Sequence, residues 1–199
     1  MRITSGDLRG REIKTPPNAP SSKMMTHPMG SREKLALFNS LNAIIGPLSN
    51  VSNVLDCYSG SGALGIEALS RGAKEAVLVE KNPVAVDIIQ QNLSSINLSE
   101  RAKSLKTDVA KLSLDNVRGF LGGDFAGFDL ILVDPPYDHF IPAEFNHLEE
   151  LLADDGVLVL SHPDTHDGTV ITPEEIFPRL ELVSDKSYAA ANIAIYRHK

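Results

Sequence analysis

The sequence predicts an α/β protein with an open, mostly parallel sheet of seven strands and helices on both faces. From residue 53 onward, short apolar runs alternate with segments of helical periodicity, which is typical of a parallel sheet covered on both sides. The last two apolar runs are joined by only a few residues, too few for a parallel crossover, so one strand near the C-terminus should be antiparallel. A length of 199 residues suits one domain with at most a short appendage.

Residues 1–30 are expected to form a basic appendage, and residues 31–199 the main domain. The first segment is rich in Gly, Pro and Ser, and residues 11–15 could pair with residues 1–5 as a β-hairpin. Residues 1–34 carry seven Lys or Arg against three Asp or Glu, although the net charge of the whole chain is −7. A basic segment on an acidic body suggests a face for an anionic partner, with a solvated tail as the alternative.

The remaining elements follow from the spacing of apolar residues. A helix is expected from Ser31 to Ile45, with Ser31 as a candidate N-cap and Gly46-Pro47 as the stop. Strands are expected at residues 53–57, 76–80, 102–107, 128–133, 156–160, 180–186 and 191–197. Helices are expected at residues 63–71, 83–96 and 143–152, with partial helicity at 109–120 and a further helix start at 173–177.

Composition excludes several classes of protein. No apolar run approaches the ~20 residues of a membrane span, and the first residues lack the apolar core of a signal peptide. The single cysteine, Cys57, excludes an intramolecular disulfide and fits a reducing compartment. We therefore expect a cytoplasmic protein without a membrane partner.

A glycine-rich turn lies between the first strand of the predicted sheet and the helix after it. Gly60, Gly62 and Gly65 allow positive φ and leave the backbone open to a ligand. The helix N-terminus behind the turn offers free N–H groups to polar or anionic atoms. The spacing also fits the dinucleotide fingerprint, which leaves a nicotinamide oxidoreductase as an alternative. The surrounding residues must therefore identify the ligand.

Acidic residues stand at or just after four predicted strand ends: Asp56, Glu80, Asp108 and Asp134. Ligands of open α/β sheets bind beyond the carboxyl ends of the strands, so the four carboxylates should share one rim. Glu80 lies 20 residues after Gly60, where a carboxylate can accept both ribose hydroxyls. Nicotinamide cofactors and S-adenosylmethionine both carry such a ribose.

The segment Asp134-Pro135-Pro136-Tyr137 distinguishes between these ligands. Its two prolines fix φ and remove two backbone donors, so the turn is rigid and its carbonyls are free to accept hydrogen bonds. The tyrosine ring can stack on a flat substrate while the oxygens accept from an exocyclic amino group. Hydride transfer has no use for this arrangement. A plain Pro-Pro turn with a half-buried tyrosine is the alternative.

These motifs resemble class I S-adenosylmethionine-dependent methyltransferases that act on exocyclic nitrogens, which have a Rossmann-like fold. Residues 55–73 closely resemble the RsmD family, which methylates a guanine N2 of 16S ribosomal RNA. Arg9-Gly-Arg11, Arg32-Glu33 and Leu37-Phe-Asn39 extend the resemblance to about residues 1–160. This chain departs from the family at residues 25–30. Most members have a sequence close to R-P-T-x-D/E there, in the region that would bind RNA. Ser161 stands where a Glu often follows the fifth strand.

The resemblance implies S-adenosylmethionine as cofactor. Asp56 would hold its methionine amino group, and the backbone from Tyr58 to Gly62 would line its carboxylate and sulfonium end. Glu80 would bind the ribose, while Asp108 would accept from adenine N6. The cofactor-binding set is Asp56, Tyr58, Ser59, Gly60, Gly62, Glu80, Lys81, Asp108 and Val109.

The resemblance also implies the substrate contacts. Asp134 and the Pro135 carbonyl would grip the target amine, and Tyr137 would stack on the base. The residues expected to contact substrate or RNA are Arg9, Arg11, Arg32 and Pro136. The expected partner is 16S ribosomal RNA or the small ribosomal subunit, with no metal and a monomeric protein. Methylation of another exocyclic or amide nitrogen (adenine N6 in DNA or RNA, or protein glutamine) and a binding module without catalysis are the alternatives.

Cysteine and histidine residues at three further places have competing interpretations. Cys57 could act as a nucleophile, as in pyrimidine C5 methylation, but its place inside a strand predicts a buried small residue. His162 and His166 could suggest a metal, although Pro163 prevents a shared helical face and favours a surface loop. His139 follows the Pro-Pro turn, where solvent exposure is favoured over a substrate contact.

Overall fold

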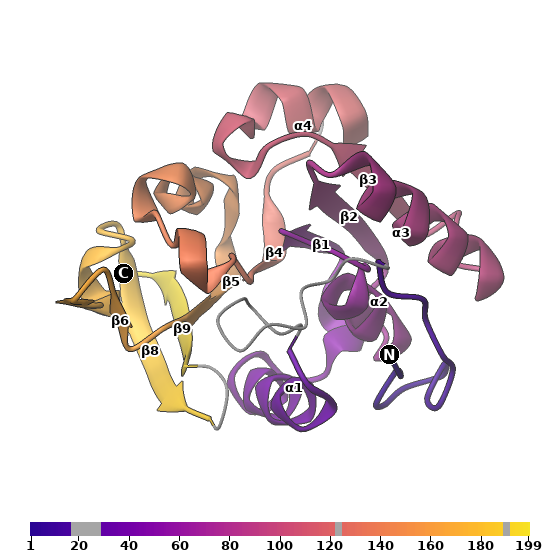
Figure 1. The fold of residues 1–199 in the computed structure, drawn as a ribbon, viewed down its shortest axis with the longest axis horizontal. Helices are drawn as coiled ribbons and strands as arrows, with labels where there is room; N and C mark the ends of the chain where they lie inside the picture. The colour runs from indigo at the N-terminus through magenta and orange to yellow at the C-terminus, as the bar shows by residue number, and fades with distance from the viewer. Residues whose placement is uncertain (17–28, 122–124, 189–191) are drawn as a thin grey trace.

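A computed structural model describes residues 1–16, 29–121, 125–188 and 192–199. Seven strands form one sheet in the order β3-β2-β1-β4-β5-β9-β8. They span Asn53–Cys57 (β1), Glu75–Glu80 (β2), Ala102–Lys106 (β3), Phe128–Val133 (β4), Leu152–His162 (β5), Leu180–Ser187 (β8) and Asn192–His198 (β9). Only β9 runs against its neighbours within this sheet. The predicted open sheet with one antiparallel strand near the C-terminus is confirmed (Figure 1).

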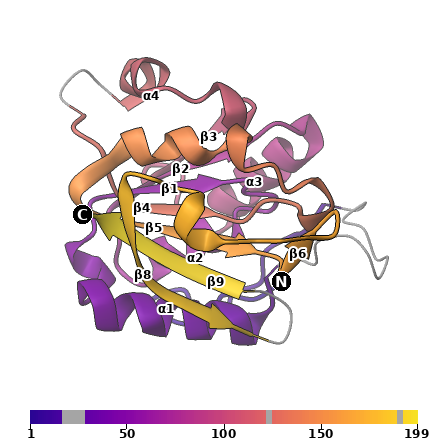
Figure 2. The same cartoon turned by 90° about the vertical axis from the view of Figure 1, so that its left-hand side faces the viewer.

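Helices cover both faces of the sheet, as expected. The α-helices are Ser31–Ile45 (α1), Ala63–Ser70 (α2), Pro83–Ser95 (α3) and Leu114–Leu121 (α4). Figures 1 and 2 show α1 and α2 on one face and α4 on the other. Short 3₁₀ helices span Leu48–Asn50 (η1), Val109–Lys111 (η2), Tyr137–His139 (η3), Pro142–Glu144 (η4), Asn146–Leu151 (η5) and Pro173–Glu175 (η6). In the part of the chain described, no helix has the length and apolarity needed to cross a bilayer.

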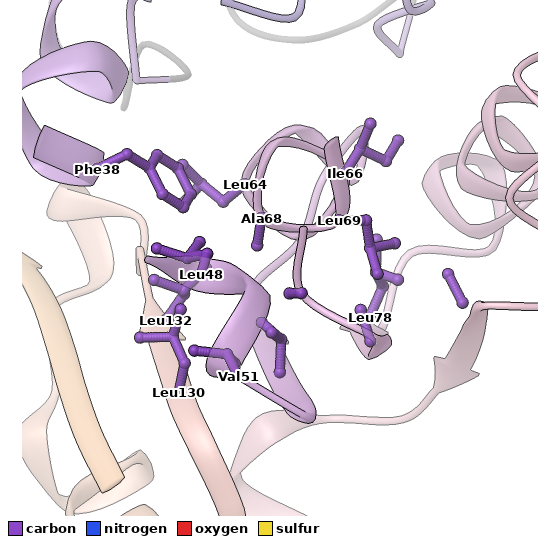
Figure 3. Packing of buried hydrophobic residues seen from close by; sticks show 14 of the residues in the cluster. Phe38, Leu48, Val51, Leu64, Ile66, Ala68, Leu69, Leu78, Leu130 and Leu132 are labelled. Atoms are coloured by element: carbon purple, nitrogen blue, oxygen red, sulfur yellow. The ribbon is translucent and has the colours of Figure 1, made fainter. Parts of the chain in front are cut away.

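The core has two layers because successive side chains of a strand point to opposite faces. Leu130 and Leu132 of β4 pack in the layer that contains Phe38 of α1 and Leu64 of α2 (Figure 3). The alternate β4 residues belong to the other layer, together with aromatic side chains of the segments after β4 and β5. Strands that are buried on both faces appear in the sequence as continuous apolar runs, as β1, β2 and β4 do.

Two predicted details are wrong. Gly30, and not Ser31, occupies the N-cap position of α1, and Ser31 is the first helical residue. The segment predicted as a helix at residues 143–152 forms the 3₁₀ helices η4 and η5. Phe145 between them has φ −138° and ψ −5°, which interrupts the regular helical backbone.

A short hairpin after β5 was not anticipated. Its strands are Thr165–His166 (β6) and Thr169–Val170 (β7), and they pair antiparallel. Asp167 and Gly168 connect them with φ 49° and 78°. Positive φ at both central residues is characteristic of a type I′ turn, for which Asp-Gly is a preferred sequence.

The N-terminal segment, residues 1–16, packs beside α2 (Figure 1). The Arg2–Glu12 bridge pairs its two arms, with a 3.0 Å hydrogen bond from the Ile3 N–H to the Arg11 carbonyl. The Asp7 N–H donates to the Ser70 carbonyl at 2.8 Å, which ties the turn to the end of α2. The division of the chain at residue 30 stays a prediction, and residues 25–28 of the family departure lie outside the described ranges.

Candidate active site

The turn that follows β1 is mostly buried, and Gly60 is half-buried. Tyr58, Gly60 and Gly62 all have positive φ, at 59°, 57° and 80°. A Cβ atom at Gly62 would lie 2.7 Å from Leu78 Cδ2, and its φ is one that other residues rarely adopt, so glycine is favoured there. A Cβ at Gly60 would meet nothing within 4 Å. The backbone at Gly60 therefore faces open space, where a ligand can approach it.

Asp56, at the end of β1, is 1% exposed. Its Oδ2 accepts a 2.8 Å hydrogen bond from the Gly65 N–H. Desolvation raises the pKa of Asp56 against this hydrogen bond, and together with the negative charges of Asp134 and Glu80 it brings that pKa to about 7. A bound cationic group would offset both effects, because it stabilises the ionised carboxylate.

Glu80 ties the end of β2 to the glycine-rich turn. Its Oε2 accepts from the Gly60 N–H at 2.9 Å, and its Oε1 accepts from the Asn82 N–H at 2.8 Å. A carboxylate has about four lone-pair sites, so these contacts leave capacity for ligand hydroxyls. The positions of the glycine and the carboxylate, 20 residues apart in sequence, are therefore fixed by direct contact.

Asp108 follows β3, beside the end of β2. Its Oδ2 lies 3.4 Å from Lys81 Nζ, and its Oδ1 accepts from the Ala110 N–H at 3.3 Å. Val109 is 2% exposed and belongs to the core layer on the α4 face. The structure thus brings Asp108 and Lys81 together.

The Asp134–Tyr137 turn follows β4 and is held by side chains from the region of β5. The Tyr137 hydroxyl lies 2.6 Å from Ser161 Oγ, and His166 Nδ1 lies 3.2 Å from the Tyr137 carbonyl oxygen. Desolvation raises the pKa of Asp134 to about 6, against a hydrogen bond from the Ser161 side chain. Pro136 is half-buried within the turn.

The four carboxylates predicted to share a rim lie at or just after the carboxyl ends of adjacent parallel strands, in the order β3, β2, β1 and β4. Parallel pairing brings their carboxyl ends to one edge of the sheet, which is where such folds bind ligands. The charge of Asp134 acts on Asp56, and the charge of Asp108 acts on Tyr58. The binding and catalytic roles of these residues stay predictions.

The three predicted RNA-contacting arginines lie on other elements, and all are exposed. Arg9 and Arg11 belong to the turn of the N-terminal segment beside α2, whereas Arg32 is in the first turn of α1. The docking of the N-terminal segment sets the backbone positions of Arg9 and Arg11. Contact with RNA stays a prediction for all three.

The competing interpretations of the cysteine and histidines separate clearly. Cys57 is fully buried, and burial raises the pKa of its thiol. A raised pKa disfavours the thiolate that a nucleophile needs, so the interpretation as a buried structural residue holds. The surface-loop interpretation is wrong for His162, which is buried at the end of β5 with Nε2 3.1 Å from Asp185 Oδ1. His166 instead contacts the Tyr137 carbonyl. The side chain of His139 is 55% exposed.

Sequence reasoning missed a buried charge network that joins the N-terminal segment to the domain. Glu67 of α2 is fully buried and accepts from the Thr4 and Ser5 N–H groups at 2.8 and 3.0 Å. It also pairs with Arg71 at 2.8 Å and with the buried Lys34 at 3.6 Å. Desolvation alone would raise the pKa of Glu67, but the Thr4 and Arg71 hydrogen bonds and the Lys34 charge outweigh it and lower that pKa. Only the i,i+4 spacing of Glu67 and Arg71 was visible in the sequence.

A second missed residue links the N-terminal segment to the glycine-rich turn. Asn92 of α3 is 1% exposed, and its Oδ1 accepts from the Lys14 N–H at 2.8 Å. Its Nδ2 donates to the carbonyls of Lys14 and Ser61, both at 2.9 Å. The end of the N-terminal segment is thus anchored one residue from Gly62.

The chain resembles known proteins over its whole length. Residues 1–197 match the family described as conserved hypothetical protein 95. The chain is 29% identical over 205 residues to the "Putative rRNA methyltransferase YlbH" of Bacillus subtilis, with all of both chains covered. It is 32% identical over 161 residues to ribosomal RNA small subunit methyltransferase D of Escherichia coli K12, covering 79% of this chain and 72% of that protein.

A solved structure shows the same fold. The "Putative methyltransferase yhhF" of Escherichia coli superposes with a TM-score of 0.74 at 25% identity, covering 100% of this chain and 98% of that one. The fold is therefore that of class I methyltransferases, as the motifs at Asp56 and Asp134 indicated. With the match over residues 1–197, this shows that the chain belongs to the conserved hypothetical protein 95 family, the RsmD family that its motifs resemble.

Proposed function

We propose that this protein transfers a methyl group from S-adenosylmethionine to the exocyclic N2 of a guanine in 16S ribosomal RNA. One observation carries the proposal. The rigid Asp134–Tyr137 turn stands beside the buried Asp56 and the bare backbone at Gly60. The turn suits an amine on a flat base, whereas Asp56 and the backbone at Gly60 suit a cofactor with a cationic amino group. The names of the relatives favour an RNA substrate.

The residues around the turn after β1 fit S-adenosylmethionine. Asp56 is a buried carboxylate whose raised pKa reflects desolvation and neighbouring negative charge, so it would hold the methionine ammonium group. Glu80 has acceptor capacity left for the ribose, and the open backbone at Gly60 leaves room for the methionine end. When bound, S-adenosylmethionine supplies a methyl group that its sulfonium charge already activates, so the protein needs chiefly to align the two reactants.

The contacts of the adenine would come from the ends of β2 and β3. Asp108 would accept from N6, and Val109 would pack against the ring. Asp108 is already oriented by its contacts with Lys81 and the Ala110 N–H. Tyr58 and Ser59 would complete the cofactor-binding residues, because the backbone of their turn would line the methionine end of the cofactor.

Asp134 and Pro135 would prepare the amine. A guanine amino group is a poor nucleophile because its lone pair is delocalised into the ring. Hydrogen bonds from its N–H groups to the Asp134 carboxylate and the Pro135 carbonyl increase its lone-pair character and stabilise the positive charge that develops on nitrogen. The pKa of Asp134, about 6, leaves this carboxylate mostly ionised at neutral pH.

Tyr137 would stack on the target base. The base must leave its own stack, which costs a few kcal/mol. Stacking on an aromatic ring contributes ~1–3 kcal/mol per base. The half-buried Tyr137 ring, held by Ser161, offers a preformed surface for this contact.

The proposal is tested by radiolabelled methyl transfer to purified small ribosomal subunits, followed by nucleoside analysis. We expect N2-methylguanosine in the 16S RNA. N6-methyladenosine, or label in a ribosomal protein, would show that another nitrogen is the acceptor. If the wild-type protein transferred no label to subunits, naked 16S RNA or ribosomal protein, the proposed function would be wrong.

Affinity for S-adenosylmethionine should fall as the pH is lowered through about 7. In the free protein the raised pKa of Asp56 means that the carboxyl is protonated below that pH, and a protonated carboxyl cannot pair with the ammonium group. The dissociation constant should rise by up to tenfold per pH unit, as measured by calorimetry between pH 7.5 and 5. Asp56→Asn should bind weakly with little pH dependence. A flat wild-type profile would remove Asp56 from the ammonium site.

The double variant Arg9→Ala with Arg11→Ala should bind 16S RNA more weakly and with less salt dependence. Each lost phosphate contact should reduce the slope of log affinity against log salt by ~0.7–0.9. Affinity for S-adenosylmethionine should not change, because both side chains are exposed. The charge-matched control is Arg197→Ala with Lys199→Ala, two exposed residues at and just after the end of β9. Because β9 is antiparallel to β5, it ends away from the carboxyl ends of the parallel strands. Equal salt slopes in both double variants and the wild type would contradict the assignment.

A further inference from the structure

We propose that Ser161 is a positioning residue that holds the Asp134 carboxylate and the Tyr137 ring in one fixed arrangement, an inference that rests on the proposed function. Ser161 lies near the end of β5 and is 2% exposed. Val133 pairs with Leu160 in the parallel β4–β5 ladder, so the next residues, Asp134 and Ser161, are neighbours across the two strands.

The hydrogen-bonding capacity of each group sets the direction of the contacts. An ionised carboxylate only accepts, so the hydrogen bond between Ser161 and Asp134 has the serine hydroxyl as its donor. That hydroxyl has a single proton, so the 2.6 Å contact with Tyr137 must have the phenol as donor. The result is a directed chain from Tyr137 through Ser161 to Asp134. Each member polarises the next, and the ring and the carboxylate are oriented as a unit.

Among the described residues, only Ser161 has a side chain with a hydrogen bond to both the Tyr137 hydroxyl and the Asp134 carboxylate. On its other side Ser161 pairs with Ile193 of β9, which has no polar side-chain atom. Burial at this position also limits replacement of the hydroxyl by water. Loss of the hydroxyl would therefore leave the Tyr137 phenol and the Asp134 carboxylate without this partner, and buried polar groups are costly to leave unpaired.

Ser161 also favours the ionised form of Asp134. Its donated hydrogen bond opposes the desolvation that raises the pKa of Asp134 to about 6. The titratable groups around the turn include Asp56 from β1, Tyr137 within the turn and Asp164 after β5. Two histidines are also close: His139 follows Tyr137, and His166 Nδ1 lies 3.2 Å from the Tyr137 carbonyl oxygen. Without the Ser161 hydroxyl, the pKa of Asp134 should rise further above its ordinary value. The Asp134 carboxylate would then be protonated at a higher pH, and it could no longer accept from the amine there.

The test compares Ser161→Ala, Ser161→Thr and Tyr137→Phe with the wild type in methyl transfer. Ser161→Ala should lower kcat about tenfold, leave the affinity for S-adenosylmethionine unchanged above pH 7, and shift the acid limb of the pH–rate profile to higher pH. Ser161→Thr keeps the hydroxyl and should restore most of the rate and the wild-type limb. Ser104→Ala, on the edge strand β3, is the matched control and should change none of these.

Non-additivity provides a second readout. Tyr137→Phe removes the first donor of the chain, so adding it to Ser161→Ala should cause little further loss. If circular dichroism shows that Ser161→Ala is unfolded, Tyr137→Phe still tests the hydrogen bond between Tyr137 and Ser161, because it leaves Ser161 in place. An inactive wild-type protein would contradict the proposed function. The positioning role alone would be overturned if the wild type is active and Ser161→Ala has the same kcat and the same acid limb. If Ser161→Ala does not fold, the same outcome for Tyr137→Phe would overturn it.

Discussion

Asp134→Asn should reduce methyl transfer about 100-fold or more while the affinity for S-adenosylmethionine stays close to that of the wild type. The carboxylate accepts from the amine only through its oxygens. An amide of the same shape places an NH₂ group in the site and removes the negative charge that stabilises the developing positive charge. Losses of this size are typical when one electrostatic contact to the transition state is removed. Single-turnover kinetics with saturating cofactor would measure the loss in the chemical step.

The pH dependence of the wild-type rate should agree with this role. Because the pKa of Asp134 is raised to about 6, the rate should fall as the pH drops through about 6 and protonation removes the acceptor. Affinity for the cofactor should be compared above pH 7, since the Asp134 charge also contributes to the raised pKa of Asp56. Asp138→Asn, at the exposed residue directly after the turn, is the matched control. Wild-type turnover by Asp134→Asn would rule out the amine contact.

Glu67→Gln should destabilise the fold by ~3–5 kcal/mol, because it leaves Lys34 without the carboxylate that compensates its buried charge. Urea unfolding would measure the change as a lower midpoint with an unchanged slope. The control is Glu12→Gln. Its pair with Arg2 is exposed, so the loss should not exceed about 1 kcal/mol.

The difference between Glu67→Gln and the wild type should depend on pH. The pKa of Glu67 is lowered in the folded protein, so its charge contributes stability above its ordinary value of 4.5. That contribution should be lost as the pH falls through the lower folded-state pKa. If Glu67→Gln and Glu12→Gln unfolded at the same urea concentration at neutral pH, the buried network would be of little consequence.

The same network affects how the basic N-terminal segment can be tested. Deletion of residues 1–14 would remove the Thr4 and Ser5 donors of Glu67 and the Arg2 carbonyl that accepts from Lys34 Nζ at 3.0 Å. It would also remove the Lys14 partner of Asn92. A truncated protein would therefore lose stability and the support of the turn at Ser61. Substitution of the exposed arginines separates RNA binding from these effects.

Much of the fold was predictable because it follows from residues close together in the chain. The strand at residues 53–57 and the strand at residues 128–133 have the predicted bounds, since buried parallel strands appear as continuous apolar runs. The helix from Ser31 ends before Gly46-Pro47 as expected. The antiparallel β9 followed from the length of one connection. Around Phe145 the same local reasoning failed, because apolar spacing does not distinguish a continuous α-helix from two short 3₁₀ helices.

The sequence by itself determined the glycine-rich turn, the carboxylates at the strand ends and the Asp134–Tyr137 turn, because each depends on the chemistry of adjacent residues at one strand end. Only the tertiary structure decided which side chains support them. Ser161 and Tyr137 are 24 residues apart, Asn92 and Ser61 are 31 apart, and Glu67 and Thr4 are 63 apart. Contacts at such separations depend on the order of the strands and on which helices pack on each face. No local pattern encodes that order, since it minimises the free energy of the whole packed chain.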